Sequence, residues 1–500
     1  MLLIKDLKRF MKNITQEINK VRLSDKFILL LGIVLIFIIV FSFLAIKRVY
    51  TLNSYYYDLG IMDQVVYNTS KGRFLEMTNQ DFMRNMSRLA IHFDPILAIF
   101  APFYWFFPSF EVLLIGQVVI VGLGALGIYL LSQIIIKKPN ISLLFSILYL
   151  LYFPVQRQIL FDFHAVTLAT TFLIFSLYFL EIKNFFWFYF FIFLSLLTKE
   201  HIGLIIMFLG LYVFFIKKEK KVGLTTFFLG SIFFISTVYF IIPYFRGEDH
   251  FASHYFSDLH LRYKDIIFNG IEYTKKILLG NLYSFFAPYQ LLIALPEWAI
   301  NTFSLNNNQR AIYFHYQAII IVFVFYSLIY GYKNFDKVIK NQLTKKMFFI
   351  IFLLLNIYSI YLYNPLPYFF VKQPVKFKEI NPINYQSIKL WREKLKDENI
   401  KLSTTPKLAP FFTNRKYYHN FLYDPAFGQM GYTEKDIIKQ INDYKNSDYV
   451  IIYRPEIGDI DKGGLPVKFY QRLKEDKNFQ MVYSDNLNEN SIEVYKKITK

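Results

Sequence analysis

The strongest constraint on this chain is a series of apolar runs, each about 20 residues long, that contain almost no charged side chain. A helix of that length crosses a hydrocarbon core of about 30 Å. The clearest runs are residues 27–46, 110–136, 141–160, 164–182, 185–198, 202–216, 222–244, 311–331 and 347–364. Charged residues make up only 19% of the chain, against about 25% in soluble domains. The sequence therefore predicts an all-α polytopic membrane protein.

Lysine and arginine residues predict the direction of these helices. A basic segment, residues 1–26, precedes the first run and is expected in the cytoplasm. Further basic groups lie at Lys137-Lys138, at Lys183, and in segments 217–221 and 333–346. The remaining connections then fall on the opposite side: a first outer loop 47–109, turns 161–163 and 199–201, a second outer loop 245–310, and everything after residue 365. The chain is predicted to cross the plasma membrane several times and to end outside the cytoplasm. Lys47 and Arg48 are an exception, because they follow the first run on the outside.

Two apolar segments are too broken or too short to be simple spans. Segment 276–304 is interrupted by Pro288 and Pro296, and both of its ends are expected on the outer side. It therefore crosses twice or not at all, and a broken or re-entrant hairpin buried in protein is one form it can take. This gives about nine to eleven spans in a transmembrane domain of residues 27–371. Segment 95–109, with Tyr104 and Trp105, is predicted to form a helix lying in the membrane interface.

The composition changes after about residue 372, where charges become frequent. Segment 384–398 has helical spacing, and the short apolar run 447–453 is flanked by turn residues. Residues 372–500 are therefore predicted to form a small α/β domain outside the membrane.

The net charge of +19 is explained by lysines that flank membrane helices and face anionic lipid. Membrane lipid is therefore the expected partner, and nucleic acid is not. The absence of cysteine excludes disulfides and thiolate metal sites. The composition does not predict an oligomeric state.

Ionisable motifs collect on the predicted outer face. All eight histidines fall in or beside outer segments: His92, His164, His201, His250, His254, His260, His315 and His419. Several have acidic or basic neighbours, in Asp58 with Asp63, His92 with Asp94, Asp162 with His164, and Lys199 with Glu200. Charges at membrane depth are costly and usually face a polar cavity, so a shared functional site is predicted there. Asp58 and Asp63, five residues apart, are not expected on one helix face.

A divalent metal stays open as a cofactor. His92 with Asp94, and Asp162 with His164, offer nitrogen and oxygen ligands. Residues two apart are poorly spaced for a shared ion on a helix, so no metal ligand is assigned.

Four motifs in order resemble a family of predicted membrane proteins catalogued as domain of unknown function 2079. They are YDLGIMDQVVYNTSKGRF, HFDPILAIFAPFYWFFPS, LFDFHAVTLA and LLTKEHIGL, followed by ALPEWAINTFS and HYQAIII. The resemblance covers most of residues 50–330 and continues into the tail. This chain has His201 where the family's pattern leads us to expect an acidic residue after Lys-Glu.

That family looks like a distant branch of the C-type glycosyltransferases, which take sugars from polyprenyl-phosphate carriers. The resemblance implies a catalytic carboxylate soon after the first span, matched here by Asp58, with Asp63 as the alternative. Substrate-binding residues would be His92, Asp94, Asp162, His164, Lys199, Glu200 and His315. Lys199, Arg73, Arg84 or Arg88 would hold the phosphate leaving group. A transporter or flippase, and a non-catalytic scaffold that binds surface polymer, are the alternative functions.

Overall fold

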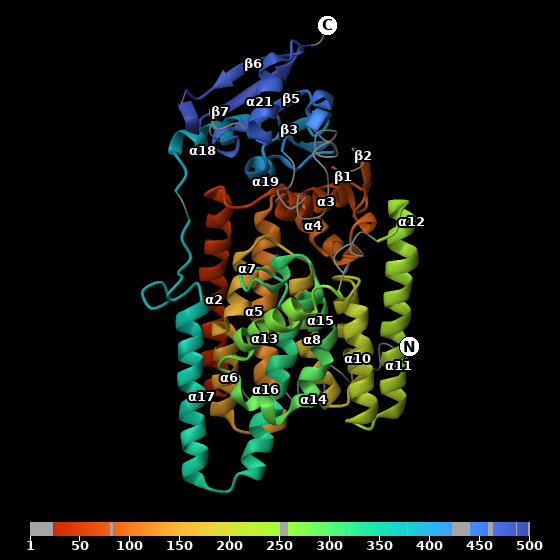
Figure 1. Ribbon diagram of the computed structural model, residues 1–500, viewed down its shortest axis with the longest axis vertical. Helices are drawn as coiled ribbons and strands as arrows, with labels where there is room; N and C mark the ends of the chain where they lie inside the picture. Colours follow the sequence, from red (N-terminus) through yellow and green to blue (C-terminus); the bar gives the residue numbers. More distant parts are fainter. Residues whose placement is uncertain are drawn as a thin grey trace.

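The computed structural model describes residues 24–80, 84–250, 259–377, 379–422, 441–458, 464–486 and 488–498. It has three tiers along its long axis (Figure 1). Helices form the lower tier, the first large loop lies above them, and the C-terminal domain lies on top. Most of the basic N-terminal segment, residues 1–23, and His254 lie outside the described residues.

Five helices are long and apolar enough to cross a membrane. They are α2 (Asp25–Tyr50), α5 (Glu111–Ile136), the continuous helix Lys220–Arg246, α16 (Ala318–Val338) and α17 (Gln342–Tyr363). The helix Lys220–Arg246 comprises α11 (Lys220–Ser236), a π-helical turn (Thr237–Ile241) and α12 (Ile242–Arg246). A sixth span is formed if α6 (Pro139–Leu151) and α7 (Phe153–Leu160), which meet at a 41° bend, are counted together. A multi-pass helical membrane protein is thus confirmed.

By helix length and apolar composition the described residues contain five or six candidate spans, fewer than the nine to eleven that were predicted. Three predicted spans are short helices: α8 (Val166–Glu181), α9 (Phe185–Leu196) and α10 (Ile202–Phe215). Their 16, 12 and 14 residues rise about 18–24 Å, less than a hydrocarbon core of about 30 Å. The apolar runs were longer than these helices because the connecting turns contain apolar residues too.

Segment 276–304 folds as a chain of short helices rather than as two spans. After α13 (Tyr263–Leu278) come 3₁₀ turns Leu282–Phe286 and Leu292–Ala294, α14 (Pro288–Leu291) and α15 (Leu295–Phe303). Gly331 of α16 packs so closely on this segment that an added Cβ would lie 1.8 Å from the Tyr283 carbonyl oxygen. Asn334 near the end of α16 donates to the Phe286 carbonyl at 2.9 Å. Irregular backbone buried against helices in this way fits the re-entrant alternative.

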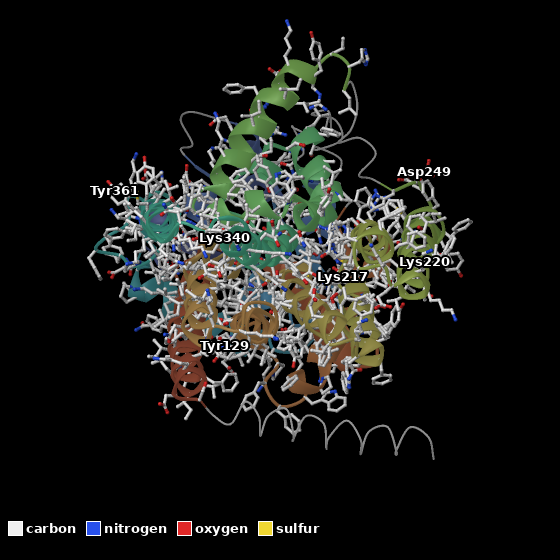
Figure 2. The ribbon with its side chains drawn as sticks, turned by 90° about the horizontal axis from the view of Figure 1, so that it is seen from below. Tyr129, Lys217, Lys220, Asp249, Lys340 and Tyr361 are labelled. Atoms are coloured by element: carbon white, nitrogen blue, oxygen red, sulfur yellow. The ribbon has the colours of Figure 1, made fainter. Side chains whose placement is uncertain are left out.

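The lysine-rich turns meet at the lower end of the bundle. The α10–α11 and α16–α17 turns lie there in Figure 1, and Figure 2 views the molecule from this end with Lys217, Lys220 and Lys340 labelled. Lys138 pairs with Asp336 at 3.1 Å, and Lys183 pairs with Glu219 at 2.6 Å. All the turns predicted to be cytoplasmic are therefore at one end. Their orientation in a membrane stays a prediction.

The first large loop forms the middle tier. Its elements are a π-helical turn (Tyr56–Gly60), α3 (Ile61–Ser70), the hairpin β1 (Glu76–Asn79) and β2 (Arg84–Ser87), 3₁₀ turns Arg88–Ala90 and Pro95–Phe100, and α4 (Ala101–Tyr104). Residues 95–104 are helical as predicted, and Trp105 beyond them is 67% exposed. Tyr104 differs from the prediction, because it is buried instead of lying at the surface.

The C-terminal domain is built on a five-stranded mixed sheet with the order β4-β3-β5-β7-β6. The strands are β3 (Leu402–Thr404), β4 (Tyr418–Asn420), β5 (Tyr449–Tyr453), β6 (Phe479–Ser484) and β7 (Ile492–Lys497). Strands β4, β3 and β5 are parallel, and β7 pairs antiparallel with both β5 and β6. Helices α18 (Pro382–Lys394), α19 (Ala409–Phe412) and α21 (Leu465–Glu475) accompany the sheet.

The edge strand β4 is covered by the first large loop. Gln80 accepts a hydrogen bond from the Asn420 backbone N–H at 2.8 Å and donates to the Tyr418 carbonyl at 3.1 Å. The Thr78 hydroxyl accepts from the Tyr418 backbone N–H at 3.1 Å. The rings of Tyr56 and Tyr418 stack with centroids 4.8 Å apart. These contacts satisfy backbone groups that an open sheet edge would expose, and they fix the loop against the domain.

Candidate functional site

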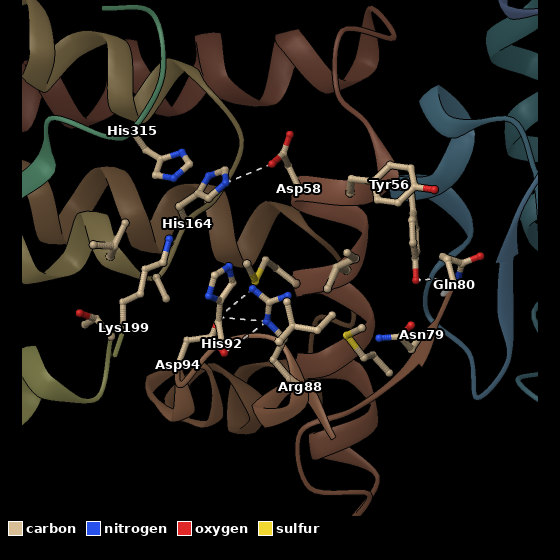
Figure 3. Close-up of a pocket in the computed structure, with 18 of the residues that line it drawn as sticks. Tyr56, Asp58, Asn79, Gln80, Arg88, His92, Asp94, His164, Lys199 and His315 are labelled. Atoms are coloured by element: carbon tan, nitrogen blue, oxygen red, sulfur yellow. Dashed lines mark hydrogen bonds and ion pairs between the residues drawn. The ribbon is translucent and has the colours of Figure 1, made fainter. Parts of the chain in front are cut away.

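A cavity of about 250 Å³ opens between the first large loop and the upper ends of the helices (Figure 3). The loop contributes one wall, and the turns before α8, α10 and α16 contribute the other. Most of the predicted site residues line it: Asp58, His92, Asp94, His164, Lys199 and His315. Segments that are far apart in sequence therefore meet around one polar space.

Asp58 and His164 form a pair across this cavity. Asp58 lies in the π-helical turn that precedes α3, and its Oδ1 is 3.1 Å from His164 Nε2. His164 Nδ1 is 3.0 Å from the Asp162 carbonyl oxygen, and the His164 backbone N–H donates to Gln117 at 2.8 Å. Both ring nitrogens thus face oxygen acceptors, so the pair can hold a proton between the imidazole and the carboxylate.

His315 lies directly against His164. The two rings stack with centroids 3.5 Å apart and an interplanar angle of 18°. Burial lowers the pKa of His315 well below its usual range, so this ring is uncharged at neutral pH. Its Nδ1 atom is buried and has no hydrogen-bond partner among the residues that the structure describes. His315 therefore offers a polar group to a ligand.

Asp162 supports the cavity from behind. Its carboxylate is buried, accepts a hydrogen bond from Ser54 at 2.7 Å and pairs with Arg48. Arg48 is one of the two basic residues that were exceptions to the charge pattern. The ion pair with Asp162 explains why a cation lies at this end of α2.

Asp63 does not line the cavity. It is fully buried, accepts hydrogen bonds from Tyr104 at 2.7 Å and from Thr413 at 2.7 Å, and joins the loop to the C-terminal domain. Burial raises the pKa of Asp63 to about 7. The five-residue spacing from Asp58 places the two carboxylates on different faces, as predicted.

The neighbouring residues His92 and Asp94 do not act as a pair. Asp94 pairs with Arg88 at 3.0 Å, and burial raises the pKa of Asp94 to about 6 although Arg88 opposes this. His92 Nδ1 instead lies 2.9 Å from Glu200 Oε1, and burial lowers the pKa of His92 to about 3. Burial opposes ionisation of Glu200, but the two histidines near it and Lys199 outweigh this effect and hold its pKa well below the usual range.

The cations proposed for phosphate binding have different surroundings. Arg73 forms an ion pair with Glu398 at 2.9 Å, and Arg88 is neutralised by Asp94. Arg84 lies on β2 and is not among the residues that line the cavity. Lys199 lines the cavity and points toward His164 in Figure 3. Within the described parts of the chain, no carboxylate forms an ion pair with Lys199.

A second cavity of about 580 Å³ continues from the first. His92, Lys199 and Tyr316 line both. Its apolar wall comes from α10, the helix Lys220–Arg246 and α15, through Leu204, Phe234, Val238 and Ile300. Glu200 lines this second cavity and not the first. We call this second cavity the groove.

Three further lining residues were not singled out as site residues from the sequence. Arg246 lines the first cavity, and His250 and Glu297 line the groove. His250 was one of the eight histidines and follows Glu248 and Asp249, but it was not assigned to the predicted site. Its place beside Glu200, 50 residues earlier in the chain, is set by the path of α10 and α11. Only three-dimensional proximity identifies it.

Comparison with known protein families identifies the family of this chain. Residues 48–486 match the family described as predicted membrane protein (DUF2079). The chain belongs to this family. The resemblance inferred from the motifs is thus confirmed, and in this DUF2079 protein the match extends through most of the C-terminal domain. No curated protein matches the chain significantly.

Proposed function

We propose that this protein is a membrane glycosyltransferase of C-type architecture. It would transfer a sugar from a polyprenyl-phosphate carrier to an acceptor hydroxyl on the outer face of the plasma membrane. The observation that carries the proposal is the combination of one polar cavity, containing Asp58 and Lys199, with an apolar groove that begins at Lys199. A lipid-linked phosphate needs these two environments side by side.

The groove suits the lipid part of such a donor. Its volume of about 580 Å³ lies in the range of ligand sites, about 300–1,000 Å³. Phe234 and Val238 belong to a candidate membrane span, so the groove runs along a helix that lipid can reach. A prenyl chain lying on this wall would bring its phosphate to Lys199 at the junction of the two cavities.

The polar cavity suits the chemistry of transfer. The acceptor hydroxyl attacks the anomeric carbon as Asp58 removes its proton, and a new glycosidic bond forms. The bond between the anomeric carbon and the phosphate oxygen breaks, and the lipid phosphate leaves with the electron pair. Lys199 stabilises the charge that develops on this leaving group. His164 orients Asp58 through the 3.1 Å contact.

The test compares Asp58→Asn with Asp63→Asn in purified protein in proteoliposomes. Transfer of a radiolabelled sugar from polyprenyl phosphate is measured across a panel of donor sugars. Loss of the base should reduce transfer by about 100-fold or more, whereas Asp63→Asn, outside the cavity, should retain activity. Retained activity in Asp58→Asn would remove Asp58 as the base. Accumulation of labelled solute without a glycosylated product would favour a transporter instead.

A further inference from the structure

His92, Glu200 and His250 converge on one point at the junction of the cavity and the groove. His92 comes from the first large loop, Glu200 from the turn before α10, and His250 from the segment after α12. One ligand-type atom from each side chain lies within 4.8 Å of the other two. His92 and Glu200 line the groove together with His250, so the convergence point faces a space that a ligand can enter.

The distances suit a small metal ion. His92 Nδ1 is 2.9 Å from Glu200 Oε1, and His250 Nε2 is 3.6 Å from the same oxygen. Ligands of a tetrahedral zinc ion with bonds of about 2.0–2.1 Å are about 3.4 Å apart. The observed separations fall on both sides of that value, so small side-chain movements would complete the geometry.

The surroundings hold the ligands in place. The Phe93 backbone N–H donates to the second carboxylate oxygen, Glu200 Oε2, at 3.0 Å. This bond fixes the carboxylate plane while leaving Oε1 directed toward the two histidines. Second-shell hydrogen bonds of this kind orient ligands in metal sites.

We infer that His92, Glu200 and His250 bind a divalent transition-metal ion, and that the ion is Zn²⁺. Two imidazole nitrogens and one carboxylate oxygen favour zinc over magnesium or calcium, which prefer oxygen ligands. Three protein ligands leave a fourth position open. That position faces the groove beside Lys199, where an oxygen of a phosphate group would be the natural fourth ligand. Of the ligand pairs that the sequence motifs suggested, His92 with Asp94 and Asp162 with His164, only His92 belongs to this cluster.

The test measures zinc in full-length protein purified in detergent. The protein is stripped with a chelator, incubated with ZnCl₂, desalted and analysed by mass spectrometry for metal. Wild type should retain about one zinc per chain, and His250→Ala should bind at least about tenfold more weakly in a titration. The matched control is His201→Ala. His201 is similarly exposed and lies next to Glu200, but it pairs with Glu297 at 3.0 Å and should not be needed.

His250 is a partly exposed position whose loss the fold should tolerate, and size-exclusion chromatography verifies this. His92→Ala and Co²⁺ loading provide second measurements, because a four-coordinate Co²⁺ site gives visible absorption bands. Equal zinc retention in wild type and His250→Ala would overturn the inference and leave the cluster as a hydrogen-bond network. Zinc binding is measured without sugar or lipid, so its failure leaves the proposed transfer reaction untouched.

Discussion

Three aspartates near the cavity have the same side chain and different surroundings. Asp58 is partly exposed and contacts His164. Asp162 is buried, but Arg48 compensates its charge. Asp63 is buried, and among the described residues two hydroxyls donate to it, those of Tyr104 and Thr413. A base needs access to its substrate, so only Asp58 is suited to proton transfer, while Asp63 is suited to holding the loop and the C-terminal domain together.

The protonation of Asp63 predicts a pH-dependent stability. Its folded-state pKa is about 7, against about 3.9 in an unfolded chain. Between these values the folded protein binds more protons than the unfolded chain, so its free energy of unfolding falls as pH rises and levels off above about 7. Asp63→Asn has no carboxyl group to ionise, so its free energy of unfolding does not fall with pH for this reason. The variant should be more stable than wild type at pH 8, by on the order of a few kcal/mol, and the difference should be smaller at pH 5.

Thermal unfolding of both proteins in detergent at the two pH values measures the difference. The same destabilisation of Asp63→Asn at pH 5 and at pH 8 would show that the carboxylate is ionised in the folded protein. Other buried acids titrate in both proteins, so the contribution of Asp63 is the difference in stability between the variant and wild type at each pH.

The α10–α11 hairpin forms part of the wall of the groove. Glycines let the two helices approach so closely that backbone touches backbone. An added Cβ at Gly230 would lie 2.5 Å from the Gly203 carbonyl oxygen, and one at Gly210 would lie 2.4 Å from the Phe227 nitrogen. Small residues at helix contacts serve this purpose in membranes. The hairpin carries Leu204 and Phe234, so its closure sets the width of the groove.

Gly230→Val should push the hairpin apart. Backbone atoms cannot move aside as flexible side chains do, so the expected destabilisation is about 1–3 kcal/mol. Binding of a polyprenyl phosphate should weaken as well. The control is Gly32→Val in α2, where no atom outside the neighbouring backbone of the same helix lies within 4 Å of the added Cβ. Thermal unfolding and lipid binding of the two variants are compared. Equal behaviour of both would contradict the assignment of the hairpin as the wall of the groove.

At the scale of the whole molecule, local patterns predicted much of the fold. The apolar runs and lysine-rich turns indicated the helices and the end at which each turn lies, because these depend on neighbouring residues. Three helices came out shorter than predicted, since hydrophobicity does not reveal where a helix stops. Contacts between residues that are far apart in the sequence were not predictable. The contact of Gln80 with Tyr418 joins residues 338 apart, and no local pattern records it.

In the candidate site, too, local sequence predicted which residues take part but not which of them contact one another. The motifs identified most of the charged and histidine residues that line the cavity. They did not indicate that Asp94 pairs with Arg88, or that His92 pairs with Glu200, because those choices depend on how the loop packs on the helices. The separate roles of Asp58 and Asp63 likewise depend on burial and on the docked C-terminal domain.

The proposed function requires a lipid-linked phosphate to bind where the cavity meets the groove. A structure by electron cryomicroscopy of the protein in nanodiscs with added polyprenyl phosphate tests it most directly. We expect phosphate density in contact with Lys199 and prenyl density along Leu204, Phe234 and Val238. Phosphate density elsewhere, or a groove filled by ordinary membrane lipid while the polar cavity stays empty, would contradict it.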